Sequence, residues 1–521
     1  MVDAAIERVV IVGGGTAGWL AACRIAAAAD PAAERPVSVT LVESPDIATI
    51  GVGEGTWPTM RRTMARIGID EAELLIACDA SFKQGSRFDG WVTGEAGDSY
   101  HHPFTPPIAG DPREAARLRP GDAFADRLCA QPQICALDLA PRQRSMPGYA
   151  GALNYAYHLD AAKLAALLKR HATGRLGVRH VRDHVLDVEA AEGGDIASVR
   201  TRDNGAIAGD LFIDCTGHAA LLIGEHCGID VVDRSDELFN DRALAVQVPV
   251  APGSAIAAQT NATAHAGGWI WDIGLPTRRG VGCVYASTFM DDAAAEATLK
   301  AYLRRTTPDC DADALNIRLL TFRSAHRERF WAGNCLAIGQ SAGFLEPLEA
   351  SAIVMIELAL DALIDDFPAN RAVMAVQAER FNAQFRYRWD RIVEFLKLHY
   401  VLSRRTEPYW RAHRDAGSIP SRLAQSLELW RHRAPAAIDF PAKDEVFPGA
   451  SYQFVLYGMG FLLPSGVAVA EREGGDMAAA IRQVEQRGRA LAASLPTNRA
   501  YLDALRAEHA GTDPILERYA E

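Results

Sequence analysis

Glycines near the start of the chain have the spacing that a dinucleotide-binding loop requires. Gly13, Gly15 and Gly18 form a GxGxxG motif, with Thr16 and Ala17 between the last two. The first glycine permits a tight turn, the second lets the backbone approach a pyrophosphate, and the third lets the next helix pack closely. The N-terminus of that helix attracts phosphate. The motif therefore predicts a loop that binds the pyrophosphate of a dinucleotide.

The elements around these glycines are those that would position such a loop. Residues 8–12 are apolar and β-branched, residues 19–29 favour a helix, and residues 37–42 predict a second strand that ends at Glu43. An acid at this distance can accept a hydrogen bond from a ribose hydroxyl. On its own GxGxxG also fits a glycine-rich loop of an ordinary α/β protein, but the flanking strands, helix and acid favour dinucleotide binding.

Later glycine turns favour FAD over a nicotinamide cofactor. Residues 207–213 and 335–338 are further buried-strand candidates that run into glycine turns, the second at Gly339. Flavoproteins of this type use such additional segments to hold the ribityl chain and the isoalloxazine ring. The sequence contains no second GxGxxG for a nicotinamide. We therefore expect the electrons to come from another protein.

Composition excludes several other classes of protein. The 521 residues are 49% hydrophobic and 23% charged, which predicts a large core and roughly two to four domain-sized units. The net charge of −12, without a basic stripe, argues against nucleic acid as a partner. Nine scattered cysteines without a CxxC pair suggest neither a disulfide framework nor a metal site. The first apolar run, interrupted by glycines, resembles neither a signal peptide nor a membrane span, so we expect a cytoplasmic protein.

The pattern of the sequence changes near residue 370, from strands and glycine turns to long helical periods. Before it, strands and glycine turns predict an α/β fold with a Rossmann-type FAD-binding domain like that of flavin monooxygenases, over residues 1–370. After it, residues 373–402, 421–432 and 477–493 have helical periods rich in Arg, Glu and Ala. We expect residues 371–521 to form a mostly helical region that covers the substrate.

Residues 51–58, GVGEGTWP, together with the N-terminal glycines, resemble the flavin-dependent halogenases of the tryptophan halogenase family. The resemblance runs from about residue 7 to about residue 465. Further similar segments are SFK (81–83) with FDGW (88–91), NYAYHLD (154–160), WIWDI (269–273), EPLEAS (346–351) and FLKLHYVLSRR (395–405). The resemblance implies a strap against the flavin and the channel to the substrate, made by Gly51, Val52, Gly53 and Glu54. A tight turn with a capping glutamate is the alternative.

A lysine is the catalytic residue that the resemblance implies first. In the family, reduced flavin and oxygen convert halide into hypohalous acid, and a lysine holds that acid before it reaches an aromatic carbon. Lys83 matches this lysine. It would act either as a hydrogen-bond donor to the hypohalous acid or as a haloamine, and these roles require opposite protonation states. Outside this context, a lone lysine is usually a solvated surface residue.

The segment EPLEAS contains the implied acid and halide site. Glu349 matches the family acid that orients the hypohalous acid or accepts the proton leaving the ring, and Glu346 is the lower-ranked rival. A helix expected over residues 351–360 gives Glu349 an alternative role as a helix-terminal acid. Ser351 and Ala352 fall where the family binds halide through backbone amides, but they replace the usual Thr-Gly. The preference between chloride and bromide stays open.

Aromatic side chains are implied on the substrate side. Trp269 and Trp271 would share one face of a strand and separate the flavin from the substrate, with core packing as the alternative. Gly274 stands where the family signature has proline. His102 and Phe104, from YHHPF, match a family segment that stacks on an indole, and an ordinary loop plug is an equal alternative.

Together these features predict an FADH2-dependent halogenase that uses halide and oxygen and receives FADH2 from a separate flavin reductase. Its substrate would be indole or an indole derivative, because the helical tail shows no cluster that would clamp free tryptophan. Gln340, where related monooxygenases have Asp, favours the halogenase branch. Two alternatives stay open: an aromatic hydroxylase, and a flavin-binding protein without turnover. The oligomeric state and the ring position are not readable from the sequence.

Overall fold

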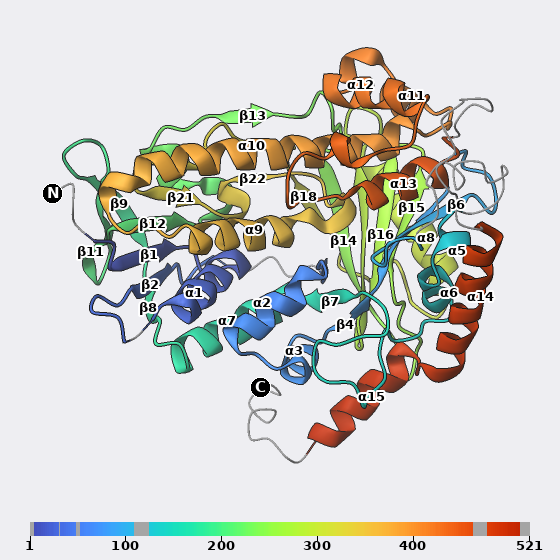
Figure 1. Cartoon of the computed structure of the whole chain (residues 1–521), viewed down its shortest axis with the longest axis horizontal. Coiled ribbons are helices and arrows are strands. Elements are labelled where there is room, and N and C mark those ends of the chain that lie inside the picture. Colours follow the sequence, from blue (N-terminus) through green and yellow to red (C-terminus); the bar gives the residue numbers. More distant parts are fainter. Residues whose placement is uncertain (1–4, 31, 48–52, 109–123, 462–476, 511–521) are drawn as a thin grey trace.

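The computed structural model describes residues 5–30, 32–47, 53–108, 124–461 and 477–510. Gly51 and Val52 of the expected strap lie outside these residues. The described part is a mixed α/β fold, as the sequence predicted. Strands of two large sheets lie at opposite ends of the molecule, and helices run between and around them (Figure 1).

The sheet next to the N-terminal glycines has the parallel order of a Rossmann-type domain. Its central strand β1 (Arg8–Val12) pairs in parallel with β2 (Ser38–Glu43) and β12 (Leu211–Asp214). Helix α1 (Thr16–Ala28) follows β1 through the glycine turn. The predicted strand, turn, helix and second strand are therefore confirmed. The remaining strands of this sheet are β8 (Arg179–Arg182), β20 (Trp331–Ala332) and β21 (Cys335–Ala337).

The strand expected over residues 207–213 is wrong in one respect, because the chain turns at Gly209 and Asp210. β11 (Gly205–Ala208) belongs to a small sheet with β10 (Ile196–Thr201) and β9 (Val185–Ala190), whereas β12 joins the Rossmann-type sheet. A Cβ on Gly209 would lie 2.8 Å from Val10 Cγ2. The Asp210 carboxylate accepts hydrogen bonds from the N–H groups of Glu7 and Arg8. These contacts hold the turn against β1.

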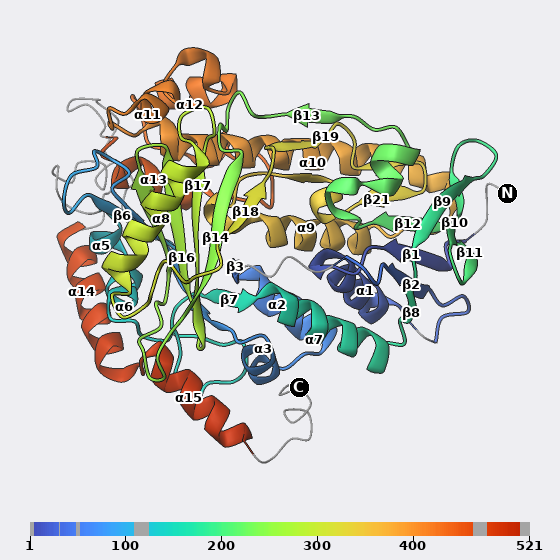
Figure 2. The ribbon, with the colours of Figure 1, turned by 180° about the vertical axis from the view of Figure 1, so that it is seen from behind.

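The second large sheet has seven strands, and α8 (Asp292–Thr306) covers its outer face (Figure 2). Apolar side chains of α8 pack on this face in a separate core. The strands in order are β18 (Arg318–Thr321), β14 (Arg242–Pro249), β17 (Arg278–Tyr285), β16 (Gly268–Gly274), β15 (Thr260–His265), β5 (Gly85–Asp89) and β6 (Ser99–Pro103).

Two three-stranded sheets complete the β-structure. One contains β3 (Gly53–Gly55), β7 (Ala156–Asp160) and β4 (Ser81–Lys83), with β7 in the middle. It brings the end of the strap beside the SFK segment. The other contains β13 (Val231–Asp233), β19 (Ala325–Arg327) and β22 (Gly343–Phe344).

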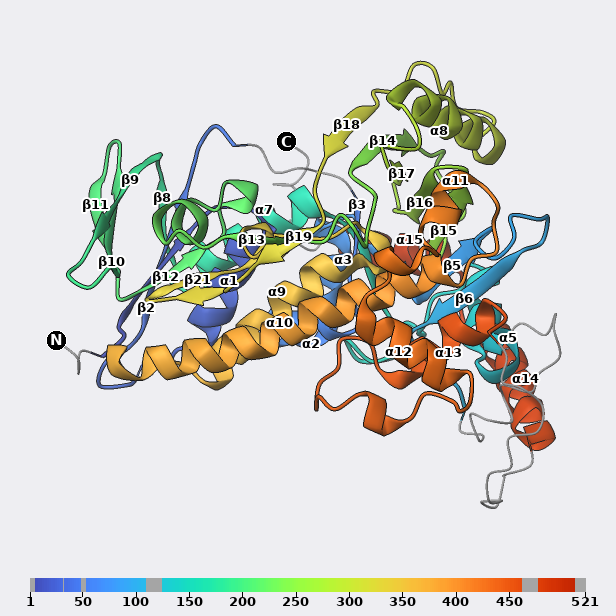
Figure 3. The ribbon, with the colours of Figure 1, turned by 90° about the horizontal axis from the view of Figure 1, so that it is seen from above.

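From Arg371 onward the described elements are helices. The 31-residue α10 (Arg371–Val401) extends across the molecule from the Rossmann-type end to the α11–α13 end (Figure 3). The three helices expected here correspond to α10, α12 (Ser421–Trp430) and α14 (Met477–Ser494). The division into two modules at residue 370 remains a prediction. The other helices are α2 (Thr59–Ile67), α3 (Glu71–Ala77), α5 (Phe124–Leu128), α6 (Gln131–Ala136), α7 (Ala161–Gly174), α9 (Ser351–Asp365), α11 (Pro408–Ala412), α13 (Gly449–Gly458) and α15 (Asn498–His509).

None of the described helices combines the length and the hydropathy that a membrane span requires.

Candidate functional site

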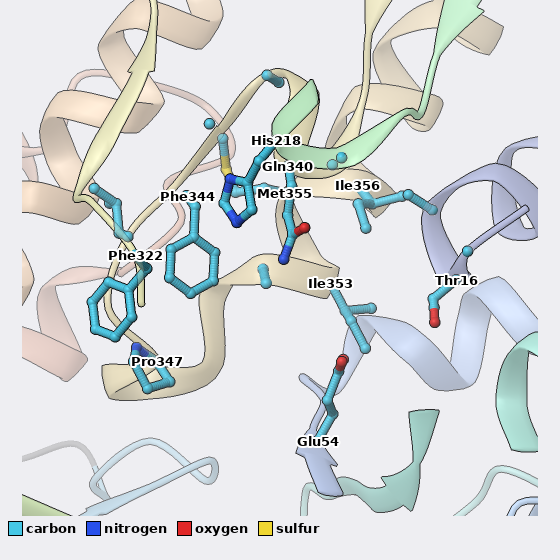
Figure 4. Close-up of a pocket in the computed structure, with 18 of the residues that line it drawn as sticks. Thr16, Glu54, His218, Phe322, Gln340, Phe344, Pro347, Ile353, Met355 and Ile356 are labelled. Atoms are coloured by element: carbon cyan, nitrogen blue, oxygen red, sulfur yellow. The ribbon is translucent and has the colours of Figure 1, made fainter. Parts of the chain in front are cut away.

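A cavity of about 840 Å³ connects the Rossmann-type sheet with the seven-stranded sheet. Its walls come from the N-terminal glycine loop, the end of the strap, the turn after β21, the EPLEAS segment and β16. In the close-up, Thr16 and Glu54 lie on one side, and Phe322, Phe344 and His218 gather on the other (Figure 4). Residues far apart in the sequence therefore line one cavity.

The glycine loop has the shape that a dinucleotide requires. Gly13 has φ +116°, and a Cβ there would lie 2.1 Å from the Cys215 carbonyl oxygen. A Cβ on Gly18 would lie 1.8 Å from the carbonyl oxygen of Gly13, so α1 packs directly on the turn. By contrast, a Cβ on Gly15 would meet no atom within 4 Å. The backbone at Gly15 is thus open to a pyrophosphate at the N-terminus of α1, and these residues fit FAD.

The other expected cofactor residues that the structure describes also line this cavity. Glu43 pairs with Lys169 at 2.8 Å. Gly339 has φ +79°, and a Cβ there would lie 2.8 Å from Ala17 Cβ. At the strap, a Cβ on Gly53 would lie 2.6 Å from Ile273 Cδ1. Burial raises the pKa of the neighbouring Glu54 to about 7, and the charge of Asp160 adds to this effect.

Lys83 is buried at the end of β4, where Gly55 of β3 leaves room for its amine. The side chain is on the same sheet face as Gly55, and a Cβ on Gly55 would lie 2.9 Å from Lys83 Nζ. Burial lowers the pKa of Lys83 to about 8, although the Glu349 carboxylate opposes this shift. Nζ also lies 5.4 Å from the centre of the Phe104 ring. A lysine that is 1% exposed is no solvated surface residue.

Glu349 lies in a turn whose backbone is unusual. It has φ +62°, and Ala350 follows with φ +53°, so two consecutive residues other than glycine adopt the left-handed conformation. Such conformations persist only where the surroundings enforce them, and they concentrate at functional sites. Here the indole Nε1 of Trp57 donates a 2.8 Å hydrogen bond to the Glu349 carbonyl oxygen.

The Glu349 carboxylate is surrounded by cationic or hydrogen-bonding groups. His102 Nδ1 lies 2.7 Å from Oε1, and His399 Nε2 lies 3.4 Å from the same oxygen. Burial raises the pKa of Glu349, but His102, His399 and Lys83 together outweigh it and bring the pKa below its usual value. Glu349 is therefore ionised at neutral pH.

The rival carboxylate has different surroundings. Glu346 is 1% exposed and accepts hydrogen bonds from Asn240 and Tyr400. Burial raises its pKa to about 7 in spite of these donors. No contact with Lys83 is found among the described residues. These differences agree with the higher rank given to Glu349.

Helix α9 begins at Ser351, as expected, and its N-terminus is open to the cavity. Ser351 and Ala352 both line the cavity. The residue before them, Ala350, has no side chain that could cap the helix. The first N–H groups of a helix have no partner within it. They can therefore donate to an anion in the cavity.

Trp269 and Trp271 lie two residues apart on β16, and both line the cavity. Their ring centres are 6.4 Å apart. The Trp271 ring packs over Gly282 on the neighbouring strand β17. A Cβ on Gly282 would lie 2.0 Å from the ring atom Cζ2, so only glycine leaves room for the indole. The pair forms a wall, and Trp269 is also part of the core.

Phe104 and His102 belong to the lysine end of the site. His102 does more than the stacking that the sequence suggested, because both of its ring nitrogens have polar partners. Its ring also packs between Phe395 and Phe454, with centres 5.6 and 6.2 Å away.

Sequence reasoning missed four contributors to this site: Trp57, Tyr100, His399 and Ser451. Trp57, Tyr100 and His399 lie in segments already noted for their family resemblance, but outside the positions that the resemblance singled out. His399 is entirely buried in α10. A histidine in the apolar sequence LKLHYV was the signal available, because buried polar groups need partners.

Comparisons with known proteins agree with this site. Residues 8–470 match the family described as tryptophan halogenase. The chain is similar to a tryptophan halogenase from Shewanella frigidimarina, with 45% identity, a TM-score of 0.92, and coverage of 97% of this chain and 98% of the other. It is 34% identical to the 7-chloro-L-tryptophan 6-halogenase KtzR of a Kutzneria species, over 95% of this chain and 99% of the relative.

A third relative is similar to this chain both in its sequence and in its solved structure. The tryptophan 6-halogenase SttH of Streptomyces toxytricini is 35% identical over 96% of this chain and 98% of its own length. Its crystal structure has a TM-score of 0.86 to this chain and covers 96% of it. The FAD-shaped glycine loop, the buried Lys83 and Glu349, and these matches lead to one conclusion: the chain belongs to the tryptophan halogenase family and is a flavin-dependent halogenase.

Proposed function

We propose that this enzyme uses FADH2 from a separate flavin reductase to halogenate an indole or an indole derivative at the Lys83–Glu349 end of the cavity. The main observation in support is that a buried amine and a buried, ionised carboxylate line the same cavity as a dinucleotide loop. The two groups are close enough for each charge to shift the pKa of the other.

Bound reduced FAD, with oxygen and halide, would supply the hypohalous acid. The open N–H groups at the start of α9, including those of Ser351 and Ala352, would hold the halide. Trp269 and Trp271 would keep the aromatic substrate away from the flavin. Gly13, Gly15, Gly18, Glu43 and Gly339 would hold the cofactor.

Lys83 and Glu349 would divide the proton transfers of the halogenation step. The ammonium of Lys83 donates a hydrogen bond to the hypohalous acid and protonates the hydroxide as it leaves. The ring carbon forms its bond to the halogen and then loses its proton to Glu349, and the C–H electron pair returns to the ring. A proton that moves from Glu349 to Lys83 restores both groups. The products are haloarene and water.

His102 and Phe104 would contact the indole ring, together with aromatic residues of α10 and α13. The relatives above carry names that specify tryptophan or chlorotryptophan, so both belong among the compounds to test. The nine free cysteines suit a reducing compartment, which supports a cytoplasmic location.

The experiment is a product analysis with purified enzyme, FAD, a flavin reductase, NADH and oxygen. Indole, tryptophan and indole derivatives are each incubated with chloride, with bromide, or without halide. We expect mass-spectrometric doublets of the added halogen on an indole. A hydroxylated product at the same rate without halide would instead establish an aromatic hydroxylase.

A further inference from the structure

Five buried side chains form a chain of close polar contacts through Glu349, hydrogen-bonded at every step except that between His399 and Glu349. Tyr100 Oη lies 2.6 Å from His399 Nδ1, and His399 Nε2 lies 3.4 Å from Glu349 Oε1. On the other side, Ser451 Oγ lies 2.9 Å from His102 Nε2, and His102 Nδ1 lies 2.7 Å from the same Oε1. Each of the five residues is less than 9% exposed.

The directions of these hydrogen bonds follow from the carboxylate. A carboxylate is negative and repels a lone pair, so the nitrogen of each imidazole that faces it carries the proton, hydrogen-bonded in His102 and at 3.4 Å in His399. A neutral imidazole with one N–H has a lone pair on its other nitrogen, which must accept from the hydroxyl beyond. Burial lowers the pKa of His399 to about 3, against the opposing effect of Glu349, so His399 is neutral. Tyr100 therefore donates to Nδ1, and the proton of His399 lies on Nε2, 3.4 Å from Glu349 Oε1 without a hydrogen bond to it.

Both histidines converge on one oxygen of the carboxylate. Among the residues that the structure describes, no donor reaches Oε2 of Glu349 with a hydrogen bond. Oε2 is thus the oxygen left for a proton from the substrate. The groups that face this carboxylate are His102 from β6, His399 from α10 and Lys83 from β4.

We propose that Tyr100 is a positioning residue for halogenation: its hydroxyl fixes the tautomer of His399, which holds Glu349 ionised with Oε2 free to take the ring proton. Ser451 does the same for His102 from the opposite side. This inference rests on the proposed function, because it concerns the base of that reaction.

The test is the pH dependence of halogenation by wild-type enzyme and by Tyr100→Phe, with FADH2 in excess and bromide saturating. Without the hydroxyl, His399 is free to adopt the other tautomer, which turns a lone pair toward Glu349 and favours its protonation. The acidic limb of the rate profile should move up by about one pH unit, because a lone pair on Nε2 in place of the N–H destabilises the charged carboxylate 3.4 Å away. Oxygen consumption should stay unchanged.

Two further variants separate this role from a structural one. Tyr409→Phe removes a buried hydroxyl that donates to Asn240, outside the chain described above, and should leave the acidic limb in place. His399→Gln keeps an N–H donor, but a glutamine has no tautomers for Tyr100 to select. The double variant with Tyr100→Phe should therefore have its acidic limb at the same pH as His399→Gln alone.

The remaining outcomes are also decisive. If Tyr100→Phe fails to fold, Ser451→Ala must show the same upward shift through His102. An acidic limb that moves by less than about 0.2 pH units from that of the wild type overturns the inference. Absence of halogenated product from the wild type at every pH overturns the proposed function instead.

Discussion

The amine of Lys83 occupies space that is free because its neighbour Gly55 has no side chain. Gly55 has no Cβ, and the space left beside it is where Nζ lies. The strap segment GVGEGT thus leaves room for the amine of Lys83 through Gly55, in addition to its expected contact with the flavin. The sequence showed both segments, but not that β7 would align them in one sheet.

The pKa of Lys83, about 8, predicts how the rate depends on pH. Below that value the ammonium form predominates, which is the form that donates to hypohalous acid. Halogenation should therefore fall as the pH rises above about 8, approaching tenfold per unit. The measurement is the rate of product formation between pH 7 and pH 10, with oxygen consumption followed in parallel as the control. A rate that rises through this range would favour the haloamine role.

The spacing of its glycines predicted the glycine loop, and the family resemblance of their segments implied Lys83 and Glu349. Neither predicted Tyr100, His399 or Ser451, which lie on β6, α10 and α13. Their convergence on Glu349 depends on how three distant elements pack. Such tertiary contacts are not encoded in any local pattern.

At the scale of elements, the strap and the EPLEAS turn are joined by Trp57. Its N–H donates to the Glu349 carbonyl oxygen, and its ring packs edge-on against Phe447, 4.8 Å between centres. This contact helps to hold Glu349 and Ala350 in the left-handed conformation.

Trp57→Phe removes that hydrogen bond and keeps an aromatic ring. We expect halogenation to fall roughly fivefold, as for one neutral hydrogen bond of about 1 kcal/mol, while flavin oxidation continues and more peroxide escapes. Product formed per NADH consumed is the quantity to measure. Trp430→Phe, which removes a comparable hydrogen bond to Asp439, is the control and should leave this ratio unchanged. An unchanged ratio in Trp57→Phe would contradict the role given to Trp57.

The elements themselves were predicted to different extents. β1, α1, β2 and the long C-terminal helices follow from periodicity and composition, and the structure confirms them. The sequence of residues 207–213 did not reveal that the strand is interrupted, since Ile207 and Phe212 on either side of the interruption are both apolar. The break depends on Gly209 passing close to Val10 and on Asp210 binding the N-terminal strand, which are contacts across about 200 residues.

At the scale of the whole molecule, one cavity extends from the glycine loop to Lys83 and Glu349. The Rossmann-type sheet contributes the glycine loop to its lining, the seven-stranded sheet contributes Trp269 and Trp271, and the N-terminus of α9 contributes Ser351 and Ala352. This arrangement suits a reaction in which an oxidant forms at one place and is used at another.

The most direct test of this account compares wild-type enzyme with Lys83→Met, which keeps an unbranched side chain but loses the amine. Both are supplied with FADH2, oxygen, bromide and an indole that the wild type brominates. The account predicts that Lys83→Met consumes oxygen at the wild-type rate and gives no bromoindole doublet in the mass spectrum. Bromoindole formed by Lys83→Met at the wild-type rate would contradict it.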